Sequence, residues 1–256
     1  MAGTRRDVHS QRPFPDAFVK LVLFDIDGTI LLTDGAGKRA IHCALEEVFG
    51  QTGPRDHRFD GKTDPQIVRE LMRIVGHSDD QINERMPRLL VRYVDCLREE
   101  LRFGAAGVTV MPGIAALLDA LRAREDVVLA LLTGNLADGA HAKLTAAGID
   151  PGQFRIGAYG SDHERRADLP AVAQRRAREQ LALDIPGKDV VVIGDTPADL
   201  HCGRSIGARA IGVATGHFTV EELRKHAPSA VFSDLSQTQD VVAAILGEPV
   251  SDRARA

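Results

Sequence analysis

An apolar run near the start of the chain, Val19-Lys20-Leu21-Val22-Leu23-Phe24-Asp25-Ile26-Asp27-Gly28-Thr29, ends in two aspartates separated by one residue. Such a run is typical of a buried strand, and open α/β sheets bind ligands beyond the carboxyl ends of their strands. Alternate side chains of an extended segment point the same way, so Asp25 and Asp27 begin on one side. Gly28 allows a tight turn that can direct both carboxylates into one pocket. Two carboxylates this close repel each other unless a cation or a proton lies between them, so the pattern indicates a metal-assisted site.

Five further apolar runs are typical of strands, and segments with helical apolar spacing separate most of them. The expected strands cover 127–132, 154–159, 190–193, 208–213 and 230–232, and the expected helices cover 112–124, 136–147, 168–183, 197–206 and 238–247. Strands that alternate with helices form a parallel sheet with helices on both faces. The sequence therefore predicts an α/β fold with a doubly wound parallel sheet.

More than eighty residues separate Asp27 from the core helix that begins at Pro112, far more than one crossover needs. Helical apolar spacing recurs within this insertion, at 37–49, 64–75 and 81–103. We expect an all-helical cap above the strand ends that shapes the pocket and excludes water, and the alternative is an insertion without substrate contact. The expected boundaries are a core domain of 18–32 and 110–248, a cap of 33–109, and disordered tails at 1–17 and 249–256.

The composition is that of an ordinary soluble protein: 256 residues, 44% hydrophobic and 27% charged, with a net charge of −4. This balance argues against a general nucleic-acid binder, which carries a concentrated basic excess. No apolar run approaches the ~18 residues of a membrane span. Arg5, Arg6 and Arg12 stand near the N-terminus without an apolar segment, which argues against a secretory signal and leaves a short organelle-targeting leader as the alternative.

The cysteines and histidines show no metal-binding spacing. Cys43, Cys96 and Cys202 are odd in number and far apart in the sequence, which favours reduced thiols and a cytoplasmic location. The nine histidines form no HxxxH or paired Cys/His pattern, so a zinc site is not expected. His201 and His217 are retained as candidates because they lie near the segments described next.

Further polar groups follow later strands. Thr133-Gly134-Asn135 ends the second strand with a hydroxyl, a glycine and an amide, and the helix that follows favours an anion at its N-terminus. Gly194-Asp195-Thr196-Pro197-Ala198-Asp199 ends the fourth strand with two more carboxylates. Asp162-His163-Glu164-Arg165-Arg166 precedes the helix at 168–183 and supplies positive charge. Each segment alone is compatible with a turn, a helix cap or a solvated face. Together they bring acids, a hydroxyl and a cation to one edge of the sheet, and capping does not explain Asp25 or Asp27.

These motifs, in this order from residue 19 to 247, resemble the haloacid dehalogenase superfamily, in particular its phosphoglycolate-phosphatase-like members with a helical cap. The resemblance implies a Rossmann-like core and a phosphatase. It implies that Asp25 is the nucleophile that forms an aspartyl-phosphate and that Asp27 is the general acid and base. It also implies a Mg²⁺ cofactor held by Asp25, Asp195 and the backbone carbonyl of Asp27, with Asp199 behind them.

The resemblance further implies a phosphate-binding group. Its members are the hydroxyl of Thr133, Gly134, the backbone N–H groups of Asn135 and Ile26, and a cation. The cation of the third motif is most often a lysine in this superfamily, and no lysine lies between Lys143 and Lys188. Arg166 is the residue that the resemblance places there, and its neighbour Arg165 is the alternative.

The acid at position 27 favours hydrolysis of a phosphate monoester, because the family's dehalogenases and phosphonatases need no acid to protonate an alkoxide. We therefore expect a Mg²⁺-dependent phosphatase of a small phosphorylated metabolite such as phosphoglycolate. The alternatives are a sugar phosphomutase of the same fold and a non-catalytic binding module. In the cap, Lys62 is interpreted as a solvated turn lysine, with a contact to a substrate carboxylate as the alternative. Thr63 and Asp64 are interpreted as caps of the helix that Pro65 begins.

Overall fold

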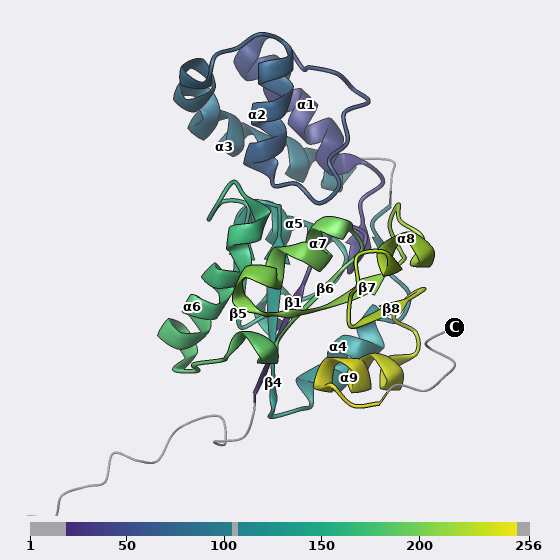
Figure 1. Cartoon of the computed structure of the whole chain (residues 1–256). Helices are drawn as coiled ribbons and strands as arrows, with labels where there is room; N and C mark the ends of the chain where they lie inside the picture. Colours follow the sequence, from purple (N-terminus) through teal and green to yellow (C-terminus); the bar gives the residue numbers. More distant parts are fainter. Residues whose placement is uncertain (1–18, 104–106, 250–256) are drawn as a thin grey trace, which may run out of the picture.

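The computed structural model describes residues 19–103 and 107–249 and contains a six-stranded parallel sheet in the order β5-β4-β1-β6-β7-β8 (Figure 1). Its strands are β1 (Lys20–Phe24), β4 (Val127–Thr133), β5 (Ile156–Tyr159), β6 (Val190–Gly194), β7 (Arg209–Val213) and β8 (Ala230–Phe232). In the register of the sheet, Phe24 is level with Leu131 of β4 and Ile193 of β6. The segments that follow these strands, with Asp25, Thr133 and Asp195, therefore emerge at the same edge of the sheet.

Helices cover both faces of the sheet. One face packs against α4 (Ile114–Arg122), α5 (Ala137–Ala146) and α9 (Thr238–Leu246), and the other packs against α6 (Leu169–Leu181) and α7 (Pro197–Cys202). β1 lies between β4 and β6, so its side chains from Leu21 to Phe24 are fully buried. Burial of each such side chain contributes about 2 kcal/mol to folding. The central strand that carries Asp25 at its end is thus held firmly on both sides.

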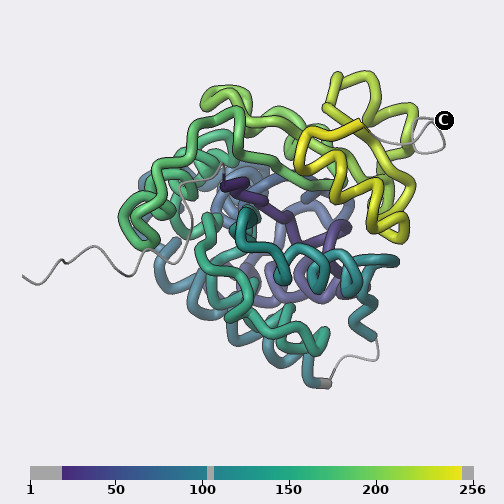
Figure 2. The backbone as a smooth tube through the Cα atoms, turned by 90° about the horizontal axis from the view of Figure 1, so that it is seen from below, coloured from purple at the N-terminus to yellow at the C-terminus, as the bar shows by residue number. Residues whose placement is uncertain are grey.

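The insertion after β1 forms a helical cap. It contains α1 (Ala36–Phe49), α2 (Asp64–Ile74) and α3 (Asp79–Phe103), which pack around their own apolar cluster above the carboxyl ends of the strands (Figure 1). Seen from below, the cap lies behind the core, at the far end of the strands (Figure 2). The chain passes between core and cap twice. These two segments, β2 (Leu31–Leu32) and β3 (Thr109–Val110), form a short antiparallel ribbon. None of the helices in the described part of the chain combines the length and apolar character that a membrane crossing requires.

The predicted α/β class, with a doubly wound parallel sheet and an inserted helical cap, is confirmed. Some bounds were wrong: β5 begins at Ile156 because Phe154 turns inward against Phe24, at 6.5 Å between ring centres. The helix expected at 197–206 ends in a 3₁₀ turn from Gly203 onward. The β2–β3 ribbon and α8 (Val220–Arg224) were not predicted, because they are too short to show a periodic pattern. The expected domain boundaries remain predictions, and the expected tails lie outside the described residues, apart from Pro249.

Candidate active site

The turn after β1 directs Asp25 and Asp27 into a cavity. The amide groups of Thr29 and Ile30 both donate to the carbonyl of Ile26, at 3.2 and 2.9 Å, which closes the chain tightly after the strand. Gly28 has φ 86°, and a Cβ atom there would overlap the carboxylate of Asp195. A glycine is therefore required both by the left-handed backbone and by the close approach of Asp195.

Arg166 is in direct contact with Asp25. It lies in a 3₁₀ turn, Arg166–Asp168, that precedes α6. Its Nη2 lies 2.8 Å from Oδ1 of Asp25 and also contacts the carboxylate of Asp199. Burial raises the pKa of Asp25 to about 6, although the charge of Arg166 opposes this change. Burial alone would lower the pKa of Arg166, but Asp199 and Asp25 hold it well above its ordinary value.

The alternative cation, Arg165, faces away from these carboxylates. Its side chain is 75% exposed and pairs with Asp168 at 3.2 Å, whereas that of Arg166 is 6% exposed. The geometry therefore favours Arg166 over Arg165 for the third motif.

Three buried carboxylates form a group that fits a divalent cation. Oxygen atoms of Asp25, Asp195 and Asp199 lie within 4.8 Å of one another. Burial and the charges of Asp199 and Asp25 raise the pKa of Asp195 well above its ordinary value. The hydroxyl of Thr29 donates to Asp195 at 3.3 Å. Hard oxygen ligands of this kind suit Mg²⁺. Arg166 supplies only one positive charge to three acids, and the charge of Mg²⁺ would offset the repulsion that remains between them.

Thr133 and Asn135 lie beside Asp27 in the same cavity. The Asn135 side-chain amide donates to Thr133 Oγ1 at 2.7 Å and to Asp27 Oδ2 at 2.6 Å. The backbone N–H of Asn135 also donates to Thr133 Oγ1, at 3.3 Å. Thr133 is fully buried, while the side chain of Asp27 is 41% exposed. The structure thus brings together the first, second and fourth sequence motifs and Arg166 around one cavity.

The cavity has a volume of about 620 Å³ and lies between the strand ends and the cap. Its cap side is formed by the loop between α1 and α2 together with residues of the three cap helices, among them Ile41, Ile67 and Tyr93. Lys62 lines the cavity but is paired, with its Nζ 2.5 Å from Glu70 Oε2 and 3.1 Å from His57 Nε2. His217 also lines the cavity and contacts Asp60 of this loop at 2.6 Å. His201 instead contacts His226, 3.1 Å away, and does not line this cavity.

The start of α2 docks directly on the second motif. The N–H of Asp64 donates to the carbonyl of Gly134 at 2.8 Å, and Asp64 Oδ2 accepts from the N–H of Leu136 at 2.8 Å. A Cβ atom at Gly134 would overlap the carbonyl oxygen of Lys62, so a glycine is required for this approach. Burial raises the pKa of Asp64 to about 7. Thr63 caps α2 as predicted, accepting from the N–H of Gln66 at 3.3 Å, but the carboxylate of Asp64 also bonds to the core.

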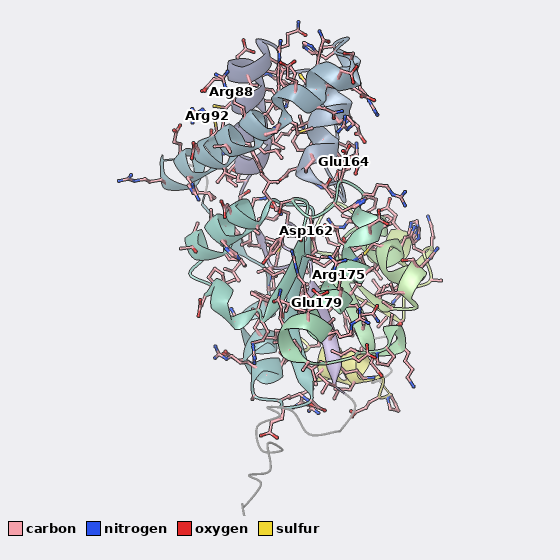
Figure 3. All side chains as sticks on the ribbon, turned by 90° about the vertical axis from the view of Figure 1, so that its left-hand side faces the viewer. Arg88, Arg92, Asp162, Glu164, Arg175 and Glu179 are labelled. Carbon is pink, nitrogen blue, oxygen red and sulfur yellow. The ribbon has the colours of Figure 1, made fainter. Side chains whose placement is uncertain are left out.

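A second contact between cap and core involves Glu164, which Figure 3 shows where the core meets the cap helices. The Thr63 hydroxyl donates to the Glu164 carbonyl at 2.6 Å, and Arg69 Nε donates to its carboxylate at 2.6 Å. Glu164 precedes Arg166 by two residues. The cap therefore contacts the segments that carry both Thr133 and Arg166.

Lys143 also belongs to the site, although it was not among the predicted residues. It lies on α5 and is 3% exposed, and its Nζ lies 2.7 Å from each carboxylate oxygen of Asp27. Ala140 and Leu144, on the same side of α5, are fully buried. A lysine on the apolar face of the helix expected at 136–147 was the signal that could have identified it.

A separate group of possible ligands lies in the cap. Cys43 and Cys96, far apart in the sequence, lie together with Glu47, with ligand atoms within 4.8 Å of one another. Arg92 binds the Glu47 carboxylate with two hydrogen bonds, at 2.6 and 2.8 Å. We interpret this group as part of the packing between α1 and α3.

Comparison with known proteins gives relatives of nearly the same length. The chain is 26% identical over 236 residues to the probable phosphatase IndB of Dickeya dadantii, covering 90% of this chain and 98% of that one. It is 26% identical over 234 residues to a phosphoglycolate phosphatase of Rhodospirillum rubrum, covering 86% and 90%. A crystal structure titled as a predicted phosphoglycolate phosphatase from Haemophilus somnus has a TM-score of 0.64 at 19% identity, covering 89% and 100%. At that identity the structure supports the fold alone.

The model of one protein family, haloacid dehalogenase-like hydrolase, matches residues 22–204, which is more than half of the chain. The matched segment runs from β1 through the cap to the end of α7 and contains all four sequence motifs described above. The resemblance seen in the sequence is confirmed, and the chain belongs to the haloacid dehalogenase-like hydrolases.

Proposed function

We propose that the chain is a Mg²⁺-dependent phosphatase that hydrolyses a small phosphorylated metabolite, phosphoglycolate or a similar compound, through an aspartyl-phosphate. The coarser part, a hydrolase acting on phosphoric monoesters, follows from the family and from the phosphatase relatives. One observation supports the proposal most directly. Asp25 and Asp27 line one cavity, and each is bonded to its own buried cation, Arg166 or Lys143.

In the proposed reaction, a carboxylate oxygen of Asp25 attacks phosphorus while the bond from phosphorus to the alkoxide oxygen breaks. Asp27 gives its proton to that alkoxide, which leaves as an alcohol. A water molecule then attacks the phosphorus of the aspartyl-phosphate and gives a proton to Asp27. The bond from phosphorus to Asp25 breaks, inorganic phosphate leaves, and both aspartates return to their starting state.

The other residues in the cavity bind the phosphoryl group. The Thr133 hydroxyl and the N–H groups of Asn135 and Ile26 would donate to its oxygens, where negative charge increases in the transition state. Arg166 keeps Asp25 oriented and offsets the charge of Asp199.

A metal ion would complete this arrangement. Asp25, Asp195 and the backbone carbonyl of Asp27 would hold Mg²⁺, with Asp199 behind them. When bound, Mg²⁺ offsets the repulsion between the Asp25 carboxylate and the phosphate and stabilises charge on the phosphoryl oxygens.

The substrate is proposed to be small because the cap closes the cavity directly above the strand ends. We propose phosphoglycolate because the Rhodospirillum relative is a phosphoglycolate phosphatase. Its carboxylate would face the loop at 51–63, in which Lys62 lines the cavity but is already paired with Glu70.

The test is phosphate release from a panel of phosphorylated metabolites, measured with Mg²⁺ and with EDTA, with Asp25→Asn as the control. We expect release that requires Mg²⁺ and that falls by about 10⁴-fold or more in Asp25→Asn, because the nucleophile is removed. Turnover of a sugar phosphate only with a bisphosphorylated activator would indicate a mutase instead. Release from no compound by the folded protein would contradict a phosphatase.

A further inference from the structure

Lys143 lies at the boundary between core and cap, with its side chain almost entirely buried. It extends from α5 of the core, and its side chain is 4% exposed. Gly37 of the cap helix α1 lies above it, so that a Cβ atom at Gly37 would be 3.4 Å from the Lys143 Nζ. A longer residue at position 37 would press on the ammonium group.

Each hydrogen of the ammonium group has an acceptor. The Nζ atom lies 2.7 Å from Asp27 Oδ1, 2.7 Å from Asp27 Oδ2 and 2.7 Å from Asn135 Oδ1. An ammonium group has three hydrogens, so Lys143 has no donor left for a substrate. Although it lines the cavity, it therefore acts on the substrate only through Asp27 and Asn135.

The two oxygens of Asp27 are held differently. Oδ2 accepts from both Lys143 and the Asn135 side-chain amide, the latter at 2.6 Å, whereas Oδ1 accepts from Lys143. The carboxylate is thus fixed in one orientation while 41% of its side chain remains exposed. Oδ1, which has fewer partners, is the oxygen that can exchange a proton with a leaving group.

Stability does not account for a lysine at this place. Taking an ammonium group out of water is costly, and a buried ion pair is often no more stabilising than apolar residues of similar volume. Ala140 and Leu144 beside it on α5 are apolar and fully buried.

We propose that Lys143 is a positioning residue that holds Asp27 for proton transfer, and that the enzyme is therefore adapted to alkyl phosphates, whose alkoxide leaving groups require a proton. This proposal rests on the proposed phosphatase function. It assigns Lys143 to a step different from that of Arg166, which contacts the nucleophile Asp25.

The test compares two substrates that differ in their need for an acid. Phosphoglycolate releases an alkoxide that must be protonated, whereas p-nitrophenyl phosphate releases a phenolate that leaves unprotonated. We measure kcat/KM, which reports the steps up to formation of the aspartyl-phosphate. For Lys143→Met we expect a fall of about 10²-fold with phosphoglycolate and less than about 3-fold with p-nitrophenyl phosphate, since general acid catalysis contributes on that scale.

A second measurement tests the later step in which water gives a proton back to Asp27. Because Asp27 must also activate water, Lys143→Met should hydrolyse the aspartyl-phosphate slowly and give a burst of p-nitrophenolate that the wild type lacks. Lys143→Arg keeps the charge but cannot reproduce all three contacts, so it should show the same substrate preference with a smaller loss. It serves as the test if the methionine variant does not fold.

Lys20→Met is the matched control. Lys20 is also largely buried and pairs with a single acid, Asp189, at the start of β1, far from the cavity. It should lower kcat/KM for both substrates equally and by less than about 2-fold, as expected for loss of a distant ion pair.

Equal losses on the two substrates in the Lys143 variants, with normal melting, would overturn the inference while leaving the phosphatase intact. A wild-type protein that cleaves neither substrate, or an Asp25→Asn variant that still does, would instead remove the proposed function, and the inference with it.

Discussion

The core side and the cap side of the cavity are built differently. On the core side, Asp25, Arg166 and Asp195 are 5%, 7% and 4% exposed, and each follows or faces a strand end. On the cap side, the side chains of Lys62 and Glu70 are 25% and 30% exposed and belong to a loop and the helix after it. On the core side Arg166 bonds to Asp25 and Asp199, and Asp195 accepts from Thr29, whereas on the cap side Lys62 and Glu70 pair near solvent.

This difference suggests that the core side of the cavity determines the rate of the reaction and the cap side determines the substrate preference. Buried charges in a region of low dielectric interact strongly, so small changes on the core side should alter the rate of the chemical step. Pairs that water can reach are screened and individually weak, so changes on the cap side should alter substrate preference modestly. Three substitutions test the comparison, beginning with the largest expected effect.

The largest effect is expected for Arg166→Met on the core side. This change leaves the carboxylates of Asp25 and Asp199 without their shared cation and removes the contact that orients Asp25, the proposed nucleophile. We expect kcat/KM for the best substrate to fall by about 10³-fold, the scale at which a preorganised electrostatic contact contributes. The measurement is steady-state phosphate release, with a thermal melt to show that the variant is folded.

Arg165→Met is the control for that experiment, because the two arginines are adjacent and only their surroundings differ. The exposed pair of Arg165 with Asp168 should be worth little, so activity should stay within about 2-fold of wild type. If Arg165→Met were the inactive variant, our choice of the third-motif cation would be wrong.

The core side of the cavity was largely predictable from the sequence. Asp25, Thr133 and Asp195 each stand at the end of an apolar run, and parallel strands bring their carboxyl ends to one edge. Lys143 was not predicted because its partners, Asp27 and Asn135, come from other segments of the core, and only its place on an apolar helix face hinted at burial. The core contact of Asp64 was not predicted because it depends on how the cap packs against the second motif. The loop at 51–63 has no periodic pattern, so nothing in the sequence fixes the pairing of Lys62 with Glu70.

An intermediate effect is expected where the two sides meet, at Asp64. Its pKa is raised by burial from 3.8 to about 7, so the folded state keeps a proton that the unfolded state releases above pH 4. Stability should therefore decrease as the pH rises from about 4 to 7 and level off above that. Asp64→Asn cannot titrate, and its amide oxygen can still accept from the N–H of Leu136.

The measurement is the melting temperature of wild type and Asp64→Asn between pH 4 and pH 8. We expect similar values at pH 4 and a difference in favour of the variant that grows up to about pH 7, reaching several degrees, since a shift of this size amounts to on the order of a few kcal/mol. Melting curves that run parallel across the range would mean that Asp64 is ionised in the folded protein throughout.

The smallest effect is expected for Lys62→Met on the cap side. Lys62 lines the cavity, but its ammonium group pairs with Glu70 and contacts His57, so it is not free to bind a substrate carboxylate. We expect KM to rise by less than about 3-fold, and to the same extent for phosphoglycolate and for a phosphate ester without a carboxylate, as for other partly exposed pairs. Steady-state kinetics with the two substrates provide the measurement.

An effect of Lys62→Met on phosphoglycolate alone would mean that the cap side contributes more to substrate binding than the comparison predicts. If Lys62→Met raised KM about 10-fold for phosphoglycolate alone, with kcat unchanged, the lysine would exchange Glu70 for the substrate carboxylate on binding. Glu70→Gln distinguishes the two cases, because it releases Lys62 without removing its charge. It should then lower KM for phosphoglycolate, whereas a lysine that only stabilises the loop would give no such gain.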